Sequence, residues 1–137
     1  MSMTFVVVEP DAAEADRLAV MLRRIEPRSE VDCVSSGEAA LRLIGEREQP
    51  PSLVLYDHRT PDLHALGFLA ELYSRSGDRT VPVAVLASTL SDQQVINCYR
   101  LGAATIIPMP VQQFELRETV RSFARPVAGA PRRTSAA

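Results

Sequence analysis

Short stretches of three residues follow four apolar runs of this 137-residue sequence, and together they hold the side chains best suited to chemistry. In chain order they are Glu9–Asp11, Asp57–Arg59, Ala87–Thr89 and Pro108–Pro110. They contain carboxylates, a guanidinium group and hydroxyl groups. The only histidines, His58 and His64, lack the partners that a nucleophile and base pair needs. There is no GxSxG turn and no glycine-rich phosphate loop, so we expect a protein that is not an enzyme.

The segments around these stretches alternate between two hydrophobic patterns. Five short runs rich in β-branched residues are typical of strands, and three are nearly continuous, as in strands covered on both faces. The predicted strands are Thr4–Val8, Glu30–Val34, Ser52–Tyr56, Val81–Leu86 and Thr105–Ile107. The other segments repeat apolar residues at helical spacing. These residues are Ala15, Leu18, Leu22, Ile25; Ala40, Leu43, Ile44; Leu66, Leu69, Leu72, Tyr73; Val95, Tyr99; and Leu116, Val120, Phe123.

Residues that begin and end helices occur between the predicted strands. Capping-box spacing is found for Ser35 with Glu38, for Ser91 with Gln94, and for Asp11 with Glu14. A cap at Asp11 is the alternative to a ligand role for that carboxylate. Five strands alternating with five helices predict an α/β fold, a doubly wound five-stranded parallel sheet with helices on both faces. Ligands bind such folds beyond the carboxyl ends of the strands, where these four stretches lie.

Composition excludes several classes of function. The net charge of −2 argues against nucleic acid as a partner, and all 15 basic residues are arginines. No apolar run approaches the roughly 20 residues that a membrane span needs, and we expect no signal peptide. Cys33 and Cys98 form no metal-binding pattern, and two thiols are typical of a reducing compartment. We therefore expect a cytoplasmic protein without a membrane partner.

Four stretches resemble the receiver domains of bacterial two-component response regulators, of the chemotaxis-Y-like kind. They are VVVEPD (Val6–Asp11), SGEAALRLI (Ser36–Ile44), PSLVLYDHRTPD (Pro51–Asp62) and LGAATIIPMP (Leu101–Pro110), and they occur in the family's order. The resemblance implies a flavodoxin-like (βα)5 fold with strand order 2-1-3-4-5. It implies a receiver domain over residues 1–125. Residues 126–137 are rich in Pro and Ala without apolar periodicity, which predicts a disordered tail or the start of a linker.

The resemblance also implies a phosphorylation site. In the family, an aspartate matching Asp57 accepts a phosphoryl group from a histidine kinase, while Mg²⁺ offsets the charge. The matching metal ligands are Glu9, Asp57 and the backbone carbonyl of Arg59, with Asp11 as a further candidate. A lysine and a hydroxyl residue bind the phosphoryl group in that family.

Several positions depart from the family's pattern. Pro10 replaces the second acid, Ala87 the hydroxyl residue, Met109 the lysine, Ile106 the switch aromatic residue, and His64-Ala65 the Asp-Gly turn. Because the chain has no lysine, no other position supplies one. Losing both donors removes about half of the roughly 5.5 kcal/mol that moves a switch from mostly off to mostly on. We expect weak Mg²⁺ binding and weak coupling of phosphorylation to conformation.

Local substitutes for the missing donors remain open. Arg59 could pair with Asp57 or with a phosphoryl group in place of the lysine, or it could be a solvated loop residue. Ser88 or Thr89 could supply the hydroxyl, or either could be an ordinary polar loop residue.

Two hypotheses about function follow, with a third that rests on fold analogy. The first is an atypical receiver that acts as a protein-interaction module. It would bind a histidine kinase or a downstream effector through the last two helices and the fifth strand, with a homodimer as a further option. The second is a phospho-receiver that uses Glu9, Asp57, Arg59 and a hydroxyl such as Ser88. The third is a flavodoxin-like cofactor binder, for which the sequence offers no specific residues.

Overall fold

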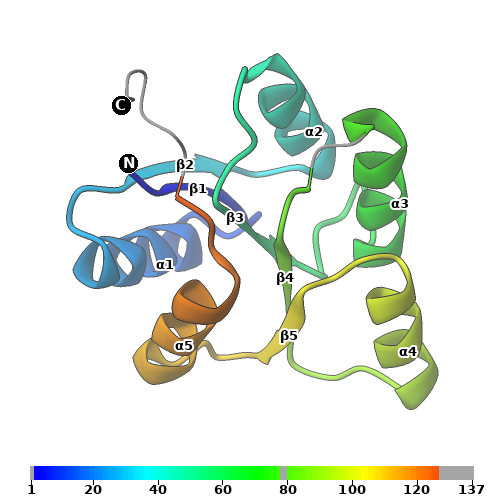
Figure 1. The fold of residues 1–137 in the computed structure, drawn as a ribbon. Coiled ribbons are helices and arrows are strands. Elements are labelled where there is room, and N and C mark those ends of the chain that lie inside the picture. Colours follow the sequence, from blue (N-terminus) through cyan, green and yellow to red (C-terminus); the bar gives the residue numbers. More distant parts are fainter. Residues whose placement is uncertain (1, 78–79, 127–137) are drawn as a thin grey trace.

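A single parallel sheet organises the chain, with strands in the order β2-β1-β3-β4-β5 (Figure 1). A computed structural model describes residues 2–77 and 80–126. The strands are β1 (Thr4–Val8), β2 (Glu30–Val34), β3 (Leu53–Asp57), β4 (Val83–Ala87) and β5 (Thr105–Pro108). All neighbouring pairs are parallel. The predicted fold and strand order are confirmed, while β3 and β4 begin one and two residues later than predicted.

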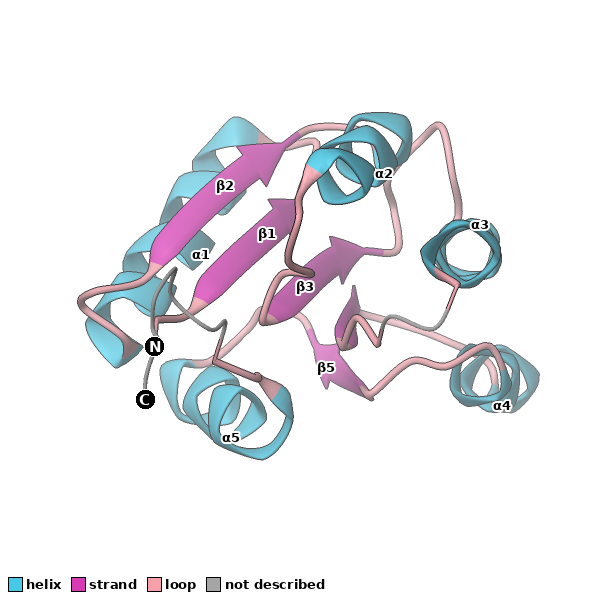
Figure 2. Cartoon of the chain, turned by 45° about the horizontal axis from the view of Figure 1, so that its top comes forward, coloured by secondary structure: helices cyan, strands magenta, loops and turns pink. Residues whose placement is uncertain are grey.

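Five helices within the described residues cover the two faces of the sheet (Figure 2). They are α1 (Ala12–Ile25), α2 (Gly37–Glu46), α3 (Ala65–Ser76), α4 (Asp92–Arg100) and α5 (Gln113–Phe123). Helices α1 and α5 pack on one face, and α2, α3 and α4 pack on the other. Within the described residues, none of these helices is long and apolar enough to cross a membrane.

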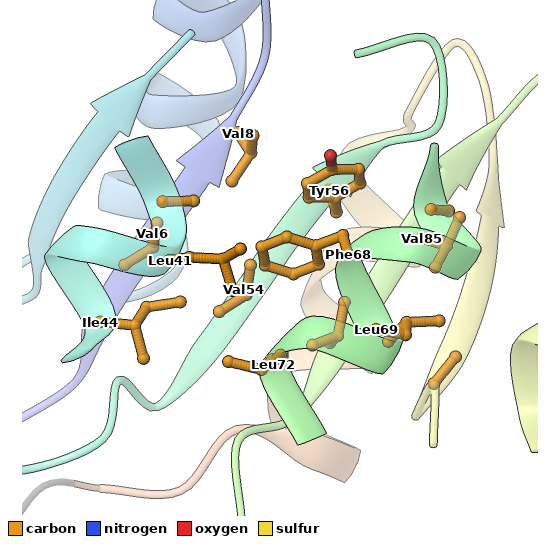
Figure 3. Close-up of a cluster of buried hydrophobic side chains, with 14 of the residues drawn as sticks. Val6, Val8, Leu41, Ile44, Val54, Tyr56, Phe68, Leu69, Leu72 and Val85 are labelled. Carbon is orange, nitrogen blue, oxygen red and sulfur yellow. The ribbon is translucent and has the colours of Figure 1, made fainter. Parts of the chain in front are cut away.

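The apolar strands are buried on both faces because alternate residues enter different clusters. Val54, Tyr56 and Val85 pack under α2, α3 and α4, where the rings of Tyr56 and Phe68 stack with centroids 4.1 Å apart (Figure 3). Leu55 and its alternate neighbours pack under α1 and α5. Two-sided burial explains why the strands read as nearly continuous apolar runs instead of alternating ones.

The helix starts confirm two predicted caps and correct a third. Ser91 and Gln94 form a complete capping box at α4. Asp11 caps α1, and its carboxylate accepts hydrogen bonds from the amides of Ala13 (3.0 Å) and Glu14 (3.3 Å). At α2 the prediction of a cap at Ser35 was wrong. The cap is the next residue, Ser36, because its hydroxyl accepts a hydrogen bond from the amide of Ala39.

Two tyrosines placed on predicted apolar helix faces lie in solvent instead. Tyr73 is 79% exposed and Tyr99 is 48% exposed. In α3 the residues Leu69 and Leu72 take the buried positions, and Tyr73 lies one residue, about 100° of helix rotation, beyond Leu72. In α4 only Cys98 is fully buried. Apart from Pro126, the predicted tail lies outside the described residues.

Candidate functional site

Two acidic side chains meet where β1 and β3 end. The register pairs Val8 with Tyr56, so the next residues, Glu9 and Asp57, lie side by side at the carboxyl edge of the sheet. The amide of Glu9 still donates to the carbonyl of Val34 at 3.0 Å, which holds its backbone in line with β2. The side chains of Glu9 and Asp57 are fully buried. The sequence predicted a site here because ligands of such folds bind beyond the carboxyl ends of the strands. The structure brings the two residues together there.

Arg59 folds back over the strand that precedes it and binds Asp57. Its terminal nitrogen Nη2 lies 2.6 Å from Asp57 Oδ2, and its Nε lies 3.1 Å from Oδ1 and 3.2 Å from Oδ2. Its backbone amide donates a further hydrogen bond to Oδ1 at 2.8 Å. The same guanidinium lies 4.0 Å from Glu9 Oε2. Arg59 therefore interacts with both buried carboxylates, although its own side chain is 53% exposed.

The pKa values of Glu9 and Asp57 shift in opposite directions. Burial and the neighbouring Asp57 carboxylate raise the pKa of Glu9 to about 7. Burial also pushes the pKa of Asp57 upward, but hydrogen bonds from Arg59 and Glu9 outweigh it and hold that pKa below its ordinary value. The Oε2 atom of Glu9 accepts a hydrogen bond from the Asp11 amide at 3.1 Å. Its Oε1 atom has no hydrogen-bond partner among the described residues.

The loop between β3 and α3 is tied down at both of its ends. The hydroxyl of Thr60 donates to the carbonyl of Asp57 at 2.6 Å. The hydroxyl of Tyr56 donates to the carbonyl of Leu63, also at 2.6 Å. These bonds fix the backbone that carries Arg59, so the position of the guanidinium follows from a well-anchored loop.

The same loop caps a neighbouring helix. The Asp62 carboxylate accepts hydrogen bonds from the amides of Gly37 (2.8 Å) and Glu38 (2.9 Å) at the start of α2. A Cβ atom at Gly37 would lie 2.6 Å from the Tyr56 hydroxyl, so a side chain there would force this contact apart. Sequence analysis missed this role of Asp62, since its partners lie about 25 residues away in the chain.

The other half of the sheet edge is apolar. Ala87 ends β4 and is buried, and its carbonyl accepts a hydrogen bond from the Met109 amide at 3.0 Å. The Met109 side chain packs against the cluster under α1 and α5. Ile106 packs against the cluster on the opposite face. Of the family positions that bind a phosphoryl group, Ala87 and Met109 therefore present only a methyl group and a thioether.

The candidate substitutes occupy different positions. Ser88 and Thr89 are exposed, and Arg59 is the only one of the three that contacts Asp57 within the described residues. Asp11 is engaged as the cap of α1, which favours the capping alternative for this residue. His58 and His64 line a groove of about 680 Å³ between the β3–α3 loop and α4, together with Leu63, Leu66, Leu90 and Cys98.

The site fits Mg²⁺ poorly in this arrangement. Pro10 offers no side-chain oxygen, and the described residues contain no group of three or more His, Cys, Asp or Glu side chains that could hold a metal ion. Mg²⁺ can bind through two carboxylates if it keeps its waters. Here, however, both oxygens of Asp57 accept hydrogen bonds from Arg59. The guanidinium of Arg59 already offsets part of the negative charge that would attract the metal.

Comparison with known proteins gives the same family over most of the chain. The model of the response regulator receiver domain matches residues 5–121. The positive alginate biosynthesis regulatory protein of Pseudomonas aeruginosa is 28% identical over 125 residues, which cover 90% of this chain and 48% of that protein. Regulatory protein LuxO of Vibrio cholerae is 30% identical over 96 residues, which cover 70% of this chain and 20% of that protein. The chain thus spans about half, or less, of the length of these relatives.

Solved structures share the fold. The chemotaxis protein CheY4 of Vibrio cholerae superposes with a TM-score of 0.79 at 15% identity, over 90% of this chain and 99% of that one. The receiver domain of a sensor histidine kinase from Pseudomonas aeruginosa superposes with a TM-score of 0.76 at 21% identity, over 90% and 98% of the two chains. That structure contains a magnesium ion coordinated in its active-site cleft.

Proposed function

The chain belongs to the response regulator receiver domain family, and from that premise we propose that it is an atypical receiver. In this proposal it acts as a protein-interaction module of two-component signalling, with weak or no switching by phosphorylation. It carries a signal through binding and not through catalysis of its own. Both the conserved architecture of the sheet and the altered residues at its edge support this function.

The observation that carries the proposal concerns Ala87 at the end of β4 and Met109 after β5. Neither side chain can donate a hydrogen bond to a phosphoryl group. A lysine contributes about 1.5–3 kcal/mol through a charged hydrogen bond, and a hydroxyl contributes about 1 kcal/mol. Neither contribution is available from Ala87 or Met109, and the Met109 side chain packs into the apolar cluster beside it. A phosphoryl group on Asp57 would therefore receive no hydrogen bond from these two side chains, and its attachment would be weakly coupled to β4 and β5.

Weak Mg²⁺ binding is part of the same proposal. The sensor-kinase receiver domain with a similar fold holds Mg²⁺ in its cleft. In this chain the corresponding acids are Glu9 and Asp57, with the carbonyl of Arg59 as a further ligand. When bound, the metal would supply positive charge beside the phosphoryl group. Pro10 removes one ligand, and the guanidinium of Arg59 competes for Asp57.

The surface proposed for partners comprises α4, β5 and α5. Three large apolar side chains on these helices are exposed, namely Ile96, Tyr99 and Phe114. Phe114 is 68% exposed, which is unusual for so large an apolar side chain. Exposed apolar side chains on α4 and α5 favour binding of a protein partner, such as a histidine kinase, an effector or a second copy of the chain.

A second candidate is a working phospho-receiver, and the position of Arg59 favours it. The terminal nitrogen of Arg59 lies 2.6 Å from Asp57, close enough to follow a phosphoryl group attached there. In this alternative Arg59 replaces the lysine, and phosphorylation by a histidine kinase remains the signal.

Phosphoryl transfer from acetyl phosphate separates the two candidates. The intact mass would be measured after incubation with acetyl phosphate and Mg²⁺, for the wild type and for Asp57→Asn. Circular dichroism would show that both are folded. We expect little or no mass increase for the wild type. A stoichiometric phosphoryl adduct that is absent from Asp57→Asn, together with a changed affinity for a partner, would replace the first candidate by the second.

A further inference from the structure

We propose that Arg59 takes the place of the metal ion at this site, and not the place of the missing lysine. The proposal deepens the function proposed above, on which it rests, by naming the cation that neutralises the carboxylates. In this view the receiver carries its own resident cation, and Mg²⁺ binds only when the guanidinium leaves.

The contacts of Arg59 place it on the metal side of the site. It lies 2.6 Å from Asp57 Oδ2 and 4.0 Å from Glu9 Oε2. Glu9 and Asp57 are the two side chains that the family resemblance assigns to the metal. A group that approaches both carboxylates at once occupies the space where a shared cation would lie.

The lysine position lies on a different strand. It is held by Met109, directly after β5, whereas Arg59 follows β3. Met109 turns toward the cluster under α1 and α5, and its backbone is bonded to Ala87. The guanidinium instead folds back onto the end of its own strand, and the bond from the Arg59 amide to Asp57 Oδ1 pins its backbone there at 2.8 Å.

The charges explain why the replacement is incomplete. Two buried carboxylates face one guanidinium, and Oε1 of Glu9 has no hydrogen-bond partner among the described residues. An unpartnered buried oxygen is costly, so the pocket retains capacity for a further positive group or a proton. Removing the guanidinium would leave two adjacent carboxylates, which is enough for a Mg²⁺ ion that keeps several waters.

The guanidinium can leave without disturbing the core. Its side chain is 53% exposed, and the contacts it would lose are hydrogen bonds and an ion pair with Asp57 and Glu9. Binding of Mg²⁺ to the wild type is therefore a competition between two cations for Asp57. A competitor of this kind lowers the apparent metal affinity by the fraction of molecules in which the site is free.

Titration with Mg²⁺ by two-dimensional amide NMR tests the proposal. The variants are Arg59→Gln, Arg59→Lys and the control Arg75→Gln, whose arginine is also about half exposed and paired with carboxylates. We expect Arg59→Gln to bind Mg²⁺ at least about tenfold more tightly than the wild type, because no guanidinium competes for Asp57. Tenfold corresponds to about 1.4 kcal/mol of binding free energy. Arg75→Gln should match the wild type, and Arg59→Lys should remain weak because it keeps a cation. Adding Asp57→Asn to Arg59→Gln should abolish the binding.

Two results would overturn the proposal. One is equal Mg²⁺ affinity in Arg59→Gln and the wild type, and the other is equally tight binding by Arg59→Lys and Arg59→Gln. If Arg59→Gln fails to fold, the Nε–H signal of Arg59 in the wild type provides the test. Where Mg²⁺ shifts the amide signals of Glu9 and Asp57, the Nε–H signal should shift with them, and metal-induced shifts at those amides with an unchanged Nε–H signal would contradict the proposal. Metal affinity is measured without a phosphoryl donor, so failure here differs from failure of the proposed function, which the acetyl phosphate reaction detects.

Discussion

The two halves of the carboxyl edge of the sheet differ in chemistry. At β1 and β3 the chain keeps two buried carboxylates and adds a guanidinium, so charged groups of both signs are concentrated there. At β4 and β5 the equivalent positions hold Ala87 and Met109, and hydrocarbon and sulfur replace hydrogen-bond donors. Both halves rest on the same two apolar clusters, so the difference is confined to the residues at the strand ends.

This contrast separates the capacity to hold a cation from the capacity to respond to a phosphoryl group. A receiver needs its carboxylates to bind a metal and its donors to register the new phosphoryl oxygens. Here the first half survives in modified form and the second half is missing. The fold accommodates that loss because Ala87 is buried and Met109 packs against the cluster under α1 and α5. Four experiments test the contrast.

The largest expected effect concerns the charged half and its pH dependence. The pKa of Glu9 is about 7 in the folded protein, above the ordinary value of 4.5 for a glutamate, so the folded state holds an extra proton between these pH values. The stabilisation that this proton provides is thus fully present below pH 4.5, and it is lost as the pH rises through 7. In metal-free buffer we expect Glu9→Gln to be more stable than the wild type above pH 8, by up to about 3 kcal/mol, with little difference near pH 5.

Urea unfolding at several pH values measures this difference. Glu118→Gln, at an exposed position on α5, is the matched control and should parallel the wild type. If Glu9→Gln has the same pH dependence as the wild type, the extra proton is not carried by Glu9.

The next effect is expected when hydrogen-bond donors are introduced into the apolar half. The double change Ala87→Thr and Met109→Lys restores a hydroxyl and an ammonium beside Asp57. From about 2–3 kcal/mol of added hydrogen bonding, we expect phosphoryl uptake from acetyl phosphate to rise by about tenfold to a hundredfold. Intact mass against time measures the rate, and Gln112→Lys adds the same charge at an exposed position outside the site. No gain in the double variant would show that the lost donors do not limit the site.

A smaller effect concerns the loop that joins the charged half to α2. Asp62→Ala removes the acceptor of the Gly37 and Glu38 amides. We expect a loss of about 1 kcal/mol in the free energy of unfolding, as for other helix caps, and faster hydrogen exchange at those two amides. Asp92→Ala, in the first turn of α4, is the comparison. Unchanged exchange at Gly37 and Glu38 would contradict the capping role.

The smallest effect is expected at the exposed hydroxyls beside the apolar half. Ser88→Ala and Thr89→Ala should change the unfolding free energy by no more than about 0.5 kcal/mol, since both residues are exposed. Phosphoryl uptake should equal that of the wild type. A marked fall in uptake by either variant would identify that hydroxyl as the substitute for the one missing at Ala87.

Much of the fold could be predicted because its signals are local. Two-sided burial of β1, β3 and β4 leaves continuous apolar runs, and helix caps such as Ser91 use partners three residues away. Prediction failed where the sequence pattern fitted two neighbouring residues equally well. The cap of α2 is Ser36 and not Ser35, and helical spacing alone could not tell that Tyr73 lies beyond the buried face of α3.

The sequence by itself determined that Glu9 and Asp57 follow adjacent parallel strands, and that Pro10, Ala87 and Met109 cannot supply an acid, a hydroxyl or an ammonium group. These statements depend only on residue types and on the order of the strands. The tertiary structure alone decided where the long side chain of Arg59 lies. A flexible side chain can reach several partners, and only the folded loop, tied by Thr60 to the end of β3, brings its guanidinium over both buried carboxylates.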